Sequence, residues 1–118
     1  MSTELERMAL RAARDAWEDL NATFFRRRLR RPVLAFLDGL GQLGRWSSAE
    51  RTLWLSRDLM VRHGWGVVIE VLKHEMAHQW VDEVLGLSSE PAHGPAFREV
   101  CRERGIDDRA SGLPSGGP

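Results

Sequence analysis

Residues 72–80 read LKHEMAHQW and contain the pattern H-E-x-x-H at His74, Glu75 and His78. They lie within the longest stretch of helical apolar periodicity in the chain, residues 65–85. Because apolar side chains cover much of its circumference, we expect this helix to be mostly buried. Histidines four positions apart lie one above the other on a helix, so both imidazoles can reach one metal ion. Glu75 lies about 100° further round the axis, where its carboxylate can reach a water beside the ion.

A catalytic zinc site takes three protein ligands and keeps a fourth position open, so one further ligand is needed. The remaining histidines are His63 and His93. His63 precedes the helix, far down its axis from the motif, and we interpret it as a surface or capping residue. His93 follows a loop that can turn back after Gly86, and Phe97 then anchors the following helix. We favour His93 as the third ligand. The alternatives are a structural role for His93 and two buried motif histidines that bond to backbone or carboxylate groups.

Two further helices are predicted at the ends of the chain. Apolar residues at helical spacing predict an amphipathic helix that ends near Phe25, and Thr3 followed by Glu6 is typical of a capping box at its start. The C-terminal helix begins after His93 and places apolar side chains, among them Cys101, at core spacing.

Short apolar runs between the first helix and the motif predict a small sheet. Turn signals bound three candidate strands, at residues 33–37, 43–46 and 52–55. Ser56 then begins a short helical turn. The order of helix, sheet, helix and helix predicts an α+β domain, in which the long helix packs on one face of a three-stranded antiparallel or mixed sheet.

The composition is that of one globular domain. The chain has 118 residues and a formal net charge of zero, which excludes a strong overall attraction to nucleic acid or membrane. Its single cysteine, Cys101, excludes an internal disulfide and a cysteine-based zinc ribbon. We place the domain at residues 1–106 and a flexible, linker-like tail at residues 107–118. Since no secretory signal or membrane-length apolar stretch is found, we expect a cytoplasmic protein.

Several motifs together resemble the SprT-like zinc metallopeptidases, a family that includes bacterial SprT and the protease domain of Spartan. The resemblance rests on residues 72–80, 93–97, 24–25, 43–45 and 52–56. The pattern H-E-x-x-H alone fits many zinc peptidases, whereas H-G-P-x-F at this distance after it is far more specific.

The resemblance implies a minimal zincin-like core that holds one zinc ion through His74, His78 and His93, with Glu75 as the general base. It also implies a protein substrate, which in the Spartan branch is linked to DNA. The arginine run at residues 26–31 could contact phosphates, although solvated charge at a helix end is the commoner explanation. Two alternatives remain: a non-catalytic zinc-binding interaction module, and a zinc hydrolase of other amide substrates.

Supporting residues are less defined by the sequence. Glu70 and Asp82 share the helical stripe of the two motif histidines and could orient them, or they could be a solvated helix edge. Because the chain has no tyrosine, oxyanion stabilisation would require Arg45, Arg98, His63 or a backbone N–H.

Overall fold

A computed structural model describes residues 2–39 and 41–109. The elements in chain order are α1 (Thr3–Phe24), β1 (Val33–Leu37), β2 (Gly44–Ser47), β3 (Thr52–Ser56), α2 (Arg57–Arg62), α3 (Trp65–Gln79), the π-helical turn η1 (Trp80–Val84) and α4 (Pro95–Arg104). The predicted α+β class is confirmed. Across the described residues no helix is long and apolar enough to cross a membrane. Residues 110–118 of the predicted tail lie outside the described residues, and the boundary after residue 106 stays a prediction.

The sheet has three strands in the order β1-β3-β2, and it is mixed. β3 pairs in parallel with β1, where Val33 lies opposite Thr52, and antiparallel with β2, where Trp46 lies opposite Leu53. The β2–β3 connection, residues 48–51, therefore forms a hairpin. Its last residue, Arg51, has a left-handed backbone with φ of 46°. This order leaves β2 at one edge of the sheet.

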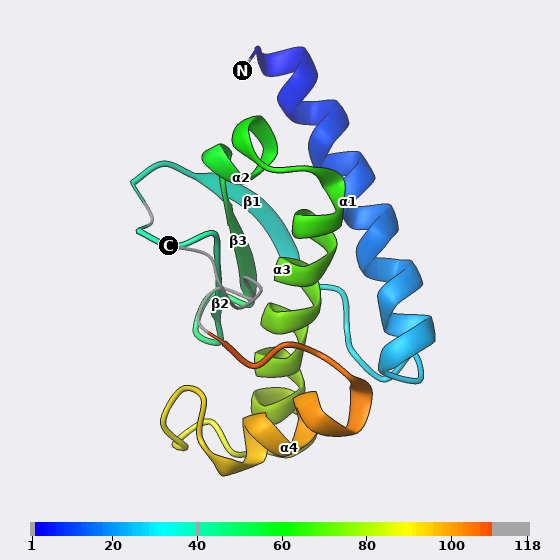
Figure 1. The fold of residues 1–118 in the computed structure, drawn as a ribbon, viewed down its shortest axis with the longest axis vertical. Helices are drawn as coiled ribbons and strands as arrows, with labels where there is room; N and C mark the ends of the chain where they lie inside the picture. The colour runs from blue at the N-terminus through cyan, green and yellow to red at the C-terminus, as the bar shows by residue number, and fades with distance from the viewer. Residues whose placement is uncertain (1, 40, 110–118) are drawn as a thin grey trace.

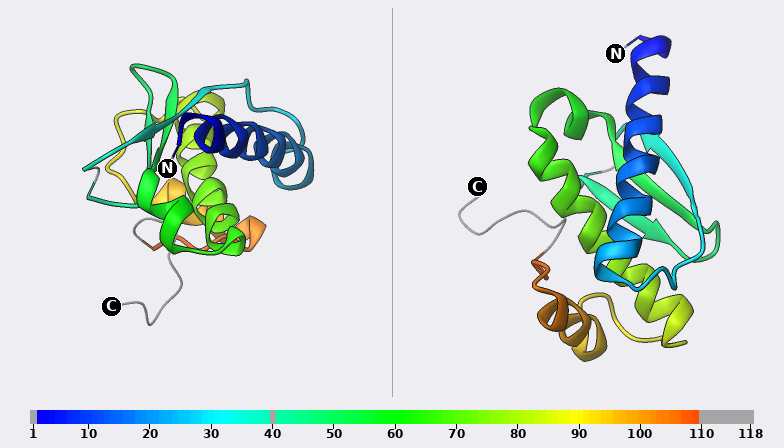
Figure 2. Two further views of the ribbon diagram at one scale, coloured as in Figure 1. Left: turned by 90° about the horizontal axis from the view of Figure 1, so that it is seen from above. Right: turned by 90° about the vertical axis from the view of Figure 1, so that its right-hand side faces the viewer.

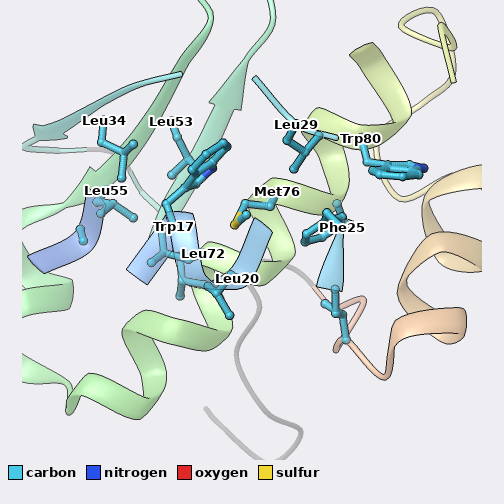
Figure 3. Packing of buried hydrophobic residues seen from close by; sticks show 14 of the residues in the cluster. Trp17, Leu20, Phe25, Leu29, Leu34, Leu53, Leu55, Leu72, Met76 and Trp80 are labelled. Atoms are coloured by element: carbon cyan, nitrogen blue, oxygen red, sulfur yellow. The ribbon is translucent and has the colours of Figure 1, made fainter. Parts of the chain in front are cut away.

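The helices α1 and α3 lie side by side against one face of the sheet (Figures 1 and 2). α1 contacts β1 and α3 contacts β2, while α4 crosses the C-terminal end of α3. Side chains from α1, the sheet and α3 converge between these layers (Figure 3). The largest buried members of this core include Trp17, Phe25, Leu53, Leu55, Leu72 and Met76. The core therefore packs α3 against the sheet, and α3 also contacts β2 directly.

The helix ends agree in part with the sequence-based expectations. α1 is capped by Ser2, whose hydroxyl accepts from the Leu5 N–H at 3.1 Å, so the capping box predicted at Thr3 is wrong by one residue. Ser56 caps α2 as expected. The long helix is α-helical only as far as Gln79, and its last turn widens into η1 before Gly86 takes a left-handed φ of 68°.

Candidate metal centre

Three imidazoles converge where α3 meets the loop that leads into α4. His74 and His78 come from successive turns of α3, and His93 is the second residue before α4. One ring nitrogen from each lies within 4.8 Å of those of the other two. The His74 Nε2 and His93 Nε2 atoms are 3.1 Å apart, close to the ~3.3 Å between two nitrogens on one tetrahedral zinc ion. The cluster could therefore hold a metal ion.

The ring nitrogen of His74 that is not part of the cluster forms a hydrogen bond with the backbone. His74 Nδ1 lies 3.1 Å from the Asp107 backbone carbonyl oxygen. A carbonyl can only accept, so Nδ1 carries the proton and Nε2 presents its lone pair to the cluster. Burial lowers the pKa of His74, against a smaller opposing effect of this hydrogen bond. The ring is thus neutral and oriented for ligation through Nε2.

The three imidazole rings pack against the aromatic ring of Phe97. Phe97 stacks on His78 with ring centroids 4.0 Å apart, and it also contacts the rings of His74 and His93 at 5.0 and 4.9 Å. Burial, with the two neighbouring imidazoles, lowers the pKa of His78 to about 3. A neutral imidazole is the form that binds metal, so the donor chemistry of the cluster fits a zinc ion.

Glu75 lies beside the cluster and is buried with 4% of its surface exposed. Its Oε1 accepts a hydrogen bond of 3.0 Å from the backbone N–H of Trp46, in the edge strand β2. Burial raises the pKa of Glu75 to about 7, while the Trp46 N–H and the charge of Arg45 act in the opposite direction. The carboxyl can therefore gain or lose a proton near neutral pH.

A glycine allows β2 to approach the motif helix this closely. A Cβ atom at Gly44 would lie 2.7 Å from Val71 Cγ1 and 3.2 Å from Glu75 Cγ. Contacts this close are not tolerated in a packed interior unless the neighbouring atoms shift. Gly44 thus fixes the distance between the strand that supplies the Trp46 N–H and the helix that supplies Glu75.

The histidines and Glu75 line a cleft of about 310 Å³. Its walls come from β2, from the end of α3 with η1, and from the loop between η1 and α4. The other lining side chains include Gln42, Arg45, Trp46, Asp82, Leu87 and Glu90. The cleft is large enough for one or two side chains of a substrate to lie against the cluster.

The other residues that the sequence suggested for the site lie in different parts of the structure. Arg45 lines the cleft, whereas Arg98 lines a hollow at the other side of α4 and His63 ends α2, before α3 begins. Glu70 pairs with a lysine one turn away on α3. Asp82 accepts from the Trp46 indole at 3.4 Å. Neither acid orients an imidazole through these bonds, so the solvated-edge interpretation fits Glu70 better.

Backbone groups that support the site leave no mark on the sequence. The Asp107 carbonyl and the Trp46 N–H are backbone atoms, which every residue carries, so no residue type marks them. Glu90, whose carboxylate bonds to the first turn of α4, did leave a signal. α4 begins after Gly94, which has no side chain to cap it, so the cap had to come from elsewhere.

Comparison with known protein families gives a match to most of the chain. The model of the SprT-like family matches residues 11–112, a span that contains the three histidines, Glu75 and β2. No curated protein and no solved structure matches the chain.

Proposed function

The chain belongs to the SprT-like family, and from that premise we propose that it is a zinc-dependent metallopeptidase that hydrolyses peptide bonds in proteins. One observation carries the proposal. Three imidazole nitrogens converge beside a buried glutamate whose pKa is raised to about 7, all in one cleft. A purely structural zinc site would need a fourth ligand and no adjacent acid–base group.

In this proposal His74, His78 and His93 hold one zinc ion and leave a position free for substrate or water. α3 with the edge strand β2 then forms a minimal zincin-like core. When bound, zinc supplies Lewis-acid polarisation of the scissile carbonyl and of the attacking water. The Asp107 carbonyl keeps the proton on His74 Nδ1, which preserves the Nε2 lone pair for the metal.

Glu75 is the general base. The Trp46 N–H holds Oε1, which leaves Oε2 to take a proton from the attacking water and then to deliver it to the leaving amine. Its pKa near 7 suits both transfers, because neither direction is strongly uphill at neutral pH. Arg45 lines the same cleft and carries the positive charge that could stabilise the oxyanion.

Replacing the base without disturbing the metal tests this mechanism. We expect Glu75→Gln to keep full zinc content and to lose at least about 100-fold of the hydrolysis of an unfolded protein substrate. Glu70→Gln is the matched control, because it makes the same change on the same helix outside the cleft, and it should leave both properties unchanged. Zinc is measured by metal analysis and cleavage by gel electrophoresis.

Two results would support the alternatives. Zinc bound by wild type without cleavage of any protein would favour a non-catalytic zinc-binding module. Hydrolysis of small amides, lost in Glu75→Gln, without cleavage of proteins would favour a different zinc hydrolase. Retention of full zinc affinity in His93→Ala would remove His93 from the ligand set.

We also propose that the protein substrates include proteins bound or crosslinked to DNA. The loop after α1 supports this proposal, since five exposed arginines follow Phe25 within it: Arg26, Arg27, Arg28, Arg30 and Arg31. Phosphate contacts by these residues would make binding fall steeply with salt. Proteolysis is compared with and without single-stranded DNA at two salt concentrations. A lack of any response to DNA at low salt would restrict the proposal to proteolysis independent of DNA.

A further inference from the structure

Glu90 reaches forward from the loop before α4 to the first turn of that helix. Its Oε1 accepts hydrogen bonds from the backbone N–H groups of Ala96, at 2.8 Å, and Phe97, at 3.4 Å. The first residue of α4 is a proline without an N–H, and the N-cap position is Gly94. Glu90 therefore provides the acceptor that an N-cap side chain usually supplies, from four residues further back.

Glu90 and Gly94 depend on each other. A Cβ atom at Gly94 would lie 2.5 Å from Glu90 Oε1 and 2.7 Å from its Cγ. The backbone of Gly94 is ordinary, with φ of −73° and ψ of −175°, so the conformation itself does not require glycine. The space occupied by the Glu90 carboxylate requires it.

The segment that this carboxylate closes contains His93 in a strained conformation. His93 has φ of 60°, in the left-handed region that residues other than glycine rarely adopt. Such a conformation persists where the surroundings hold it. Two backbone bonds, from Glu90 N–H to Leu87 O and from Gly94 N–H to Pro91 O, both 3.0 Å, tighten the loop. The Glu90 side chain then ties the loop to α4.

We propose that Glu90 is a positioning residue of the metal centre. By joining the loop to the first turn of α4, it holds His93 towards His74 and keeps Phe97 beneath the imidazoles. The proposal rests on the proposed function, because the property that Glu90 sets is the zinc affinity of the cluster. Glu90 acts through His93 and Phe97 and does not itself contact the ion.

Zinc affinity of the metal-free protein, measured by competition with a chelator, tests the role. We expect Glu90→Ala to weaken zinc binding by about 10- to 100-fold, as for other groups that orient metal ligands. Glu90→Gln keeps a carbonyl oxygen for the same two N–H groups and should stay within about threefold of wild type. Glu99→Ala removes an exposed carboxylate from α4 and should have no effect.

The Glu90→Gln variant also distinguishes a residue that positions the ligands from one that binds zinc itself. If the Glu90 carboxylate were itself a zinc ligand, Glu90→Gln would weaken binding as much as Glu90→Ala does, and that result would overturn the proposal.

The double variant Glu90→Ala/Gly94→Ser separates positioning from helix capping. The Gly94→Ser change supplies an ordinary N-cap hydroxyl to α4 but no tie to the loop. We expect the unfolding free energy of the zinc-free protein to recover towards wild type while zinc affinity stays low. Recovery of zinc affinity would overturn the proposal, because Glu90 would then be a helix cap alone.

Failure of this proposal is distinguishable from failure of the proposed function. If wild type binds no zinc, both are wrong. If wild type binds zinc and His93→Ala weakens it, but Glu90→Ala does not, the metal centre stands and the role of Glu90 is wrong.

Discussion

At the scale of single residues, Gly44 sets the separation between the edge strand and the motif helix. We expect Gly44→Ala to destabilise the protein by about 1–3 kcal/mol, because the new methyl group meets the fully buried Val71. Movement of β2 away from α3 to accommodate the methyl group would also lengthen the hydrogen bond from the Trp46 N–H to Glu75. We therefore expect the proposed peptidase activity to fall. Urea unfolding and cleavage assays on the same samples measure both effects.

The control for this change is Gly66→Ala, in the first turn of α3. Apart from the adjacent residues and the helix backbone, nothing in the described part of the chain lies within 4 Å of a Cβ at Gly66, so we expect unchanged stability or a gain of up to about 1 kcal/mol. Equal effects of the two substitutions would mean that the close approach at Gly44 is unimportant.

Cys101 provides a second test at this scale. Burial, with the negative charges of Asp108 and Asp107, raises the pKa of the Cys101 thiol to about 12. Its thiolate fraction at pH 8 is then roughly a thousandfold below that of a free thiol with a pKa of about 8.5. We expect a disulfide reagent to leave the native protein unlabelled and to label it fully in denaturant. Rapid labelling without denaturant would show that the packing of α4 around Cys101 is wrong.

The sequence predicted the side chains of the site better than their backbone conformations. The side chains of His74, Glu75 and His78 were identifiable, because their spacing on a helix is itself the signal. The conformation of His93 was not identifiable, since its left-handed φ depends on the loop that Glu90 closes.

At the scale of elements, Arg104 joins α4 to the end of α1 and to η1. Its Nε donates to the Phe24 carbonyl at 2.9 Å, and its guanidinium lies 4.4 Å from the ring centroid of Trp80 and 5.3 Å from that of Phe25. Lysine keeps the charge but lacks the planar fork that makes these contacts together. We expect Arg104→Lys to cost about 1.5–3 kcal/mol in urea unfolding.

Arg102→Lys is the matched control for that change. The Arg102 side chain is 75% exposed on the same helix, so its replacement should stay within about 0.5 kcal/mol of wild type. A similar small effect at Arg104 would mean that α4 is held by its apolar face alone.

Element boundaries were more predictable than element pairing. Apolar runs bounded by turn residues located all three strands, because both signals are local in the chain. The sequence does not specify the parallel pairing of β1 with β3, since strand order depends on packing between distant segments. The π-helical turn was missed for a related reason. Trp80 and Val81 are apolar and buried, as they would also be in an α-helix. The pattern of apolar residues therefore does not distinguish an α-helix from a π-helix here.

At the scale of the whole molecule, one ion pair joins three segments that are far apart in the sequence. Arg51, in the β2–β3 turn, forms a two-pronged pair with Glu83 of η1, with one bond of 2.7 Å, and donates to the carbonyls of Arg30 and Arg31 in the loop after α1. Gln79 at the end of α3 bonds to both Glu83 and the Arg30 carbonyl. The pair therefore ties the hairpin, the motif helix and the arginine loop together.

This network predicts an acid dependence of stability that Glu83 controls. Hydrogen bonding to Arg51 lowers the pKa of Glu83 in the folded state below its ordinary value of 4.5. A lowered folded pKa means that the stabilisation is present above pH 4.5 and is lost as pH falls through the folded pKa. For zinc-free protein in chelator, we expect Glu83→Gln to cost about 1 kcal/mol at pH 7 and less than that at pH 3. Glu50→Gln, an exposed acid in the same turn, should match wild type at both pH values. Urea unfolding at each pH gives the difference. A cost of Glu83→Gln that is equal at pH 7 and pH 3 would show that the side chain contributes by packing, and that no charge links the hairpin to the end of the motif helix.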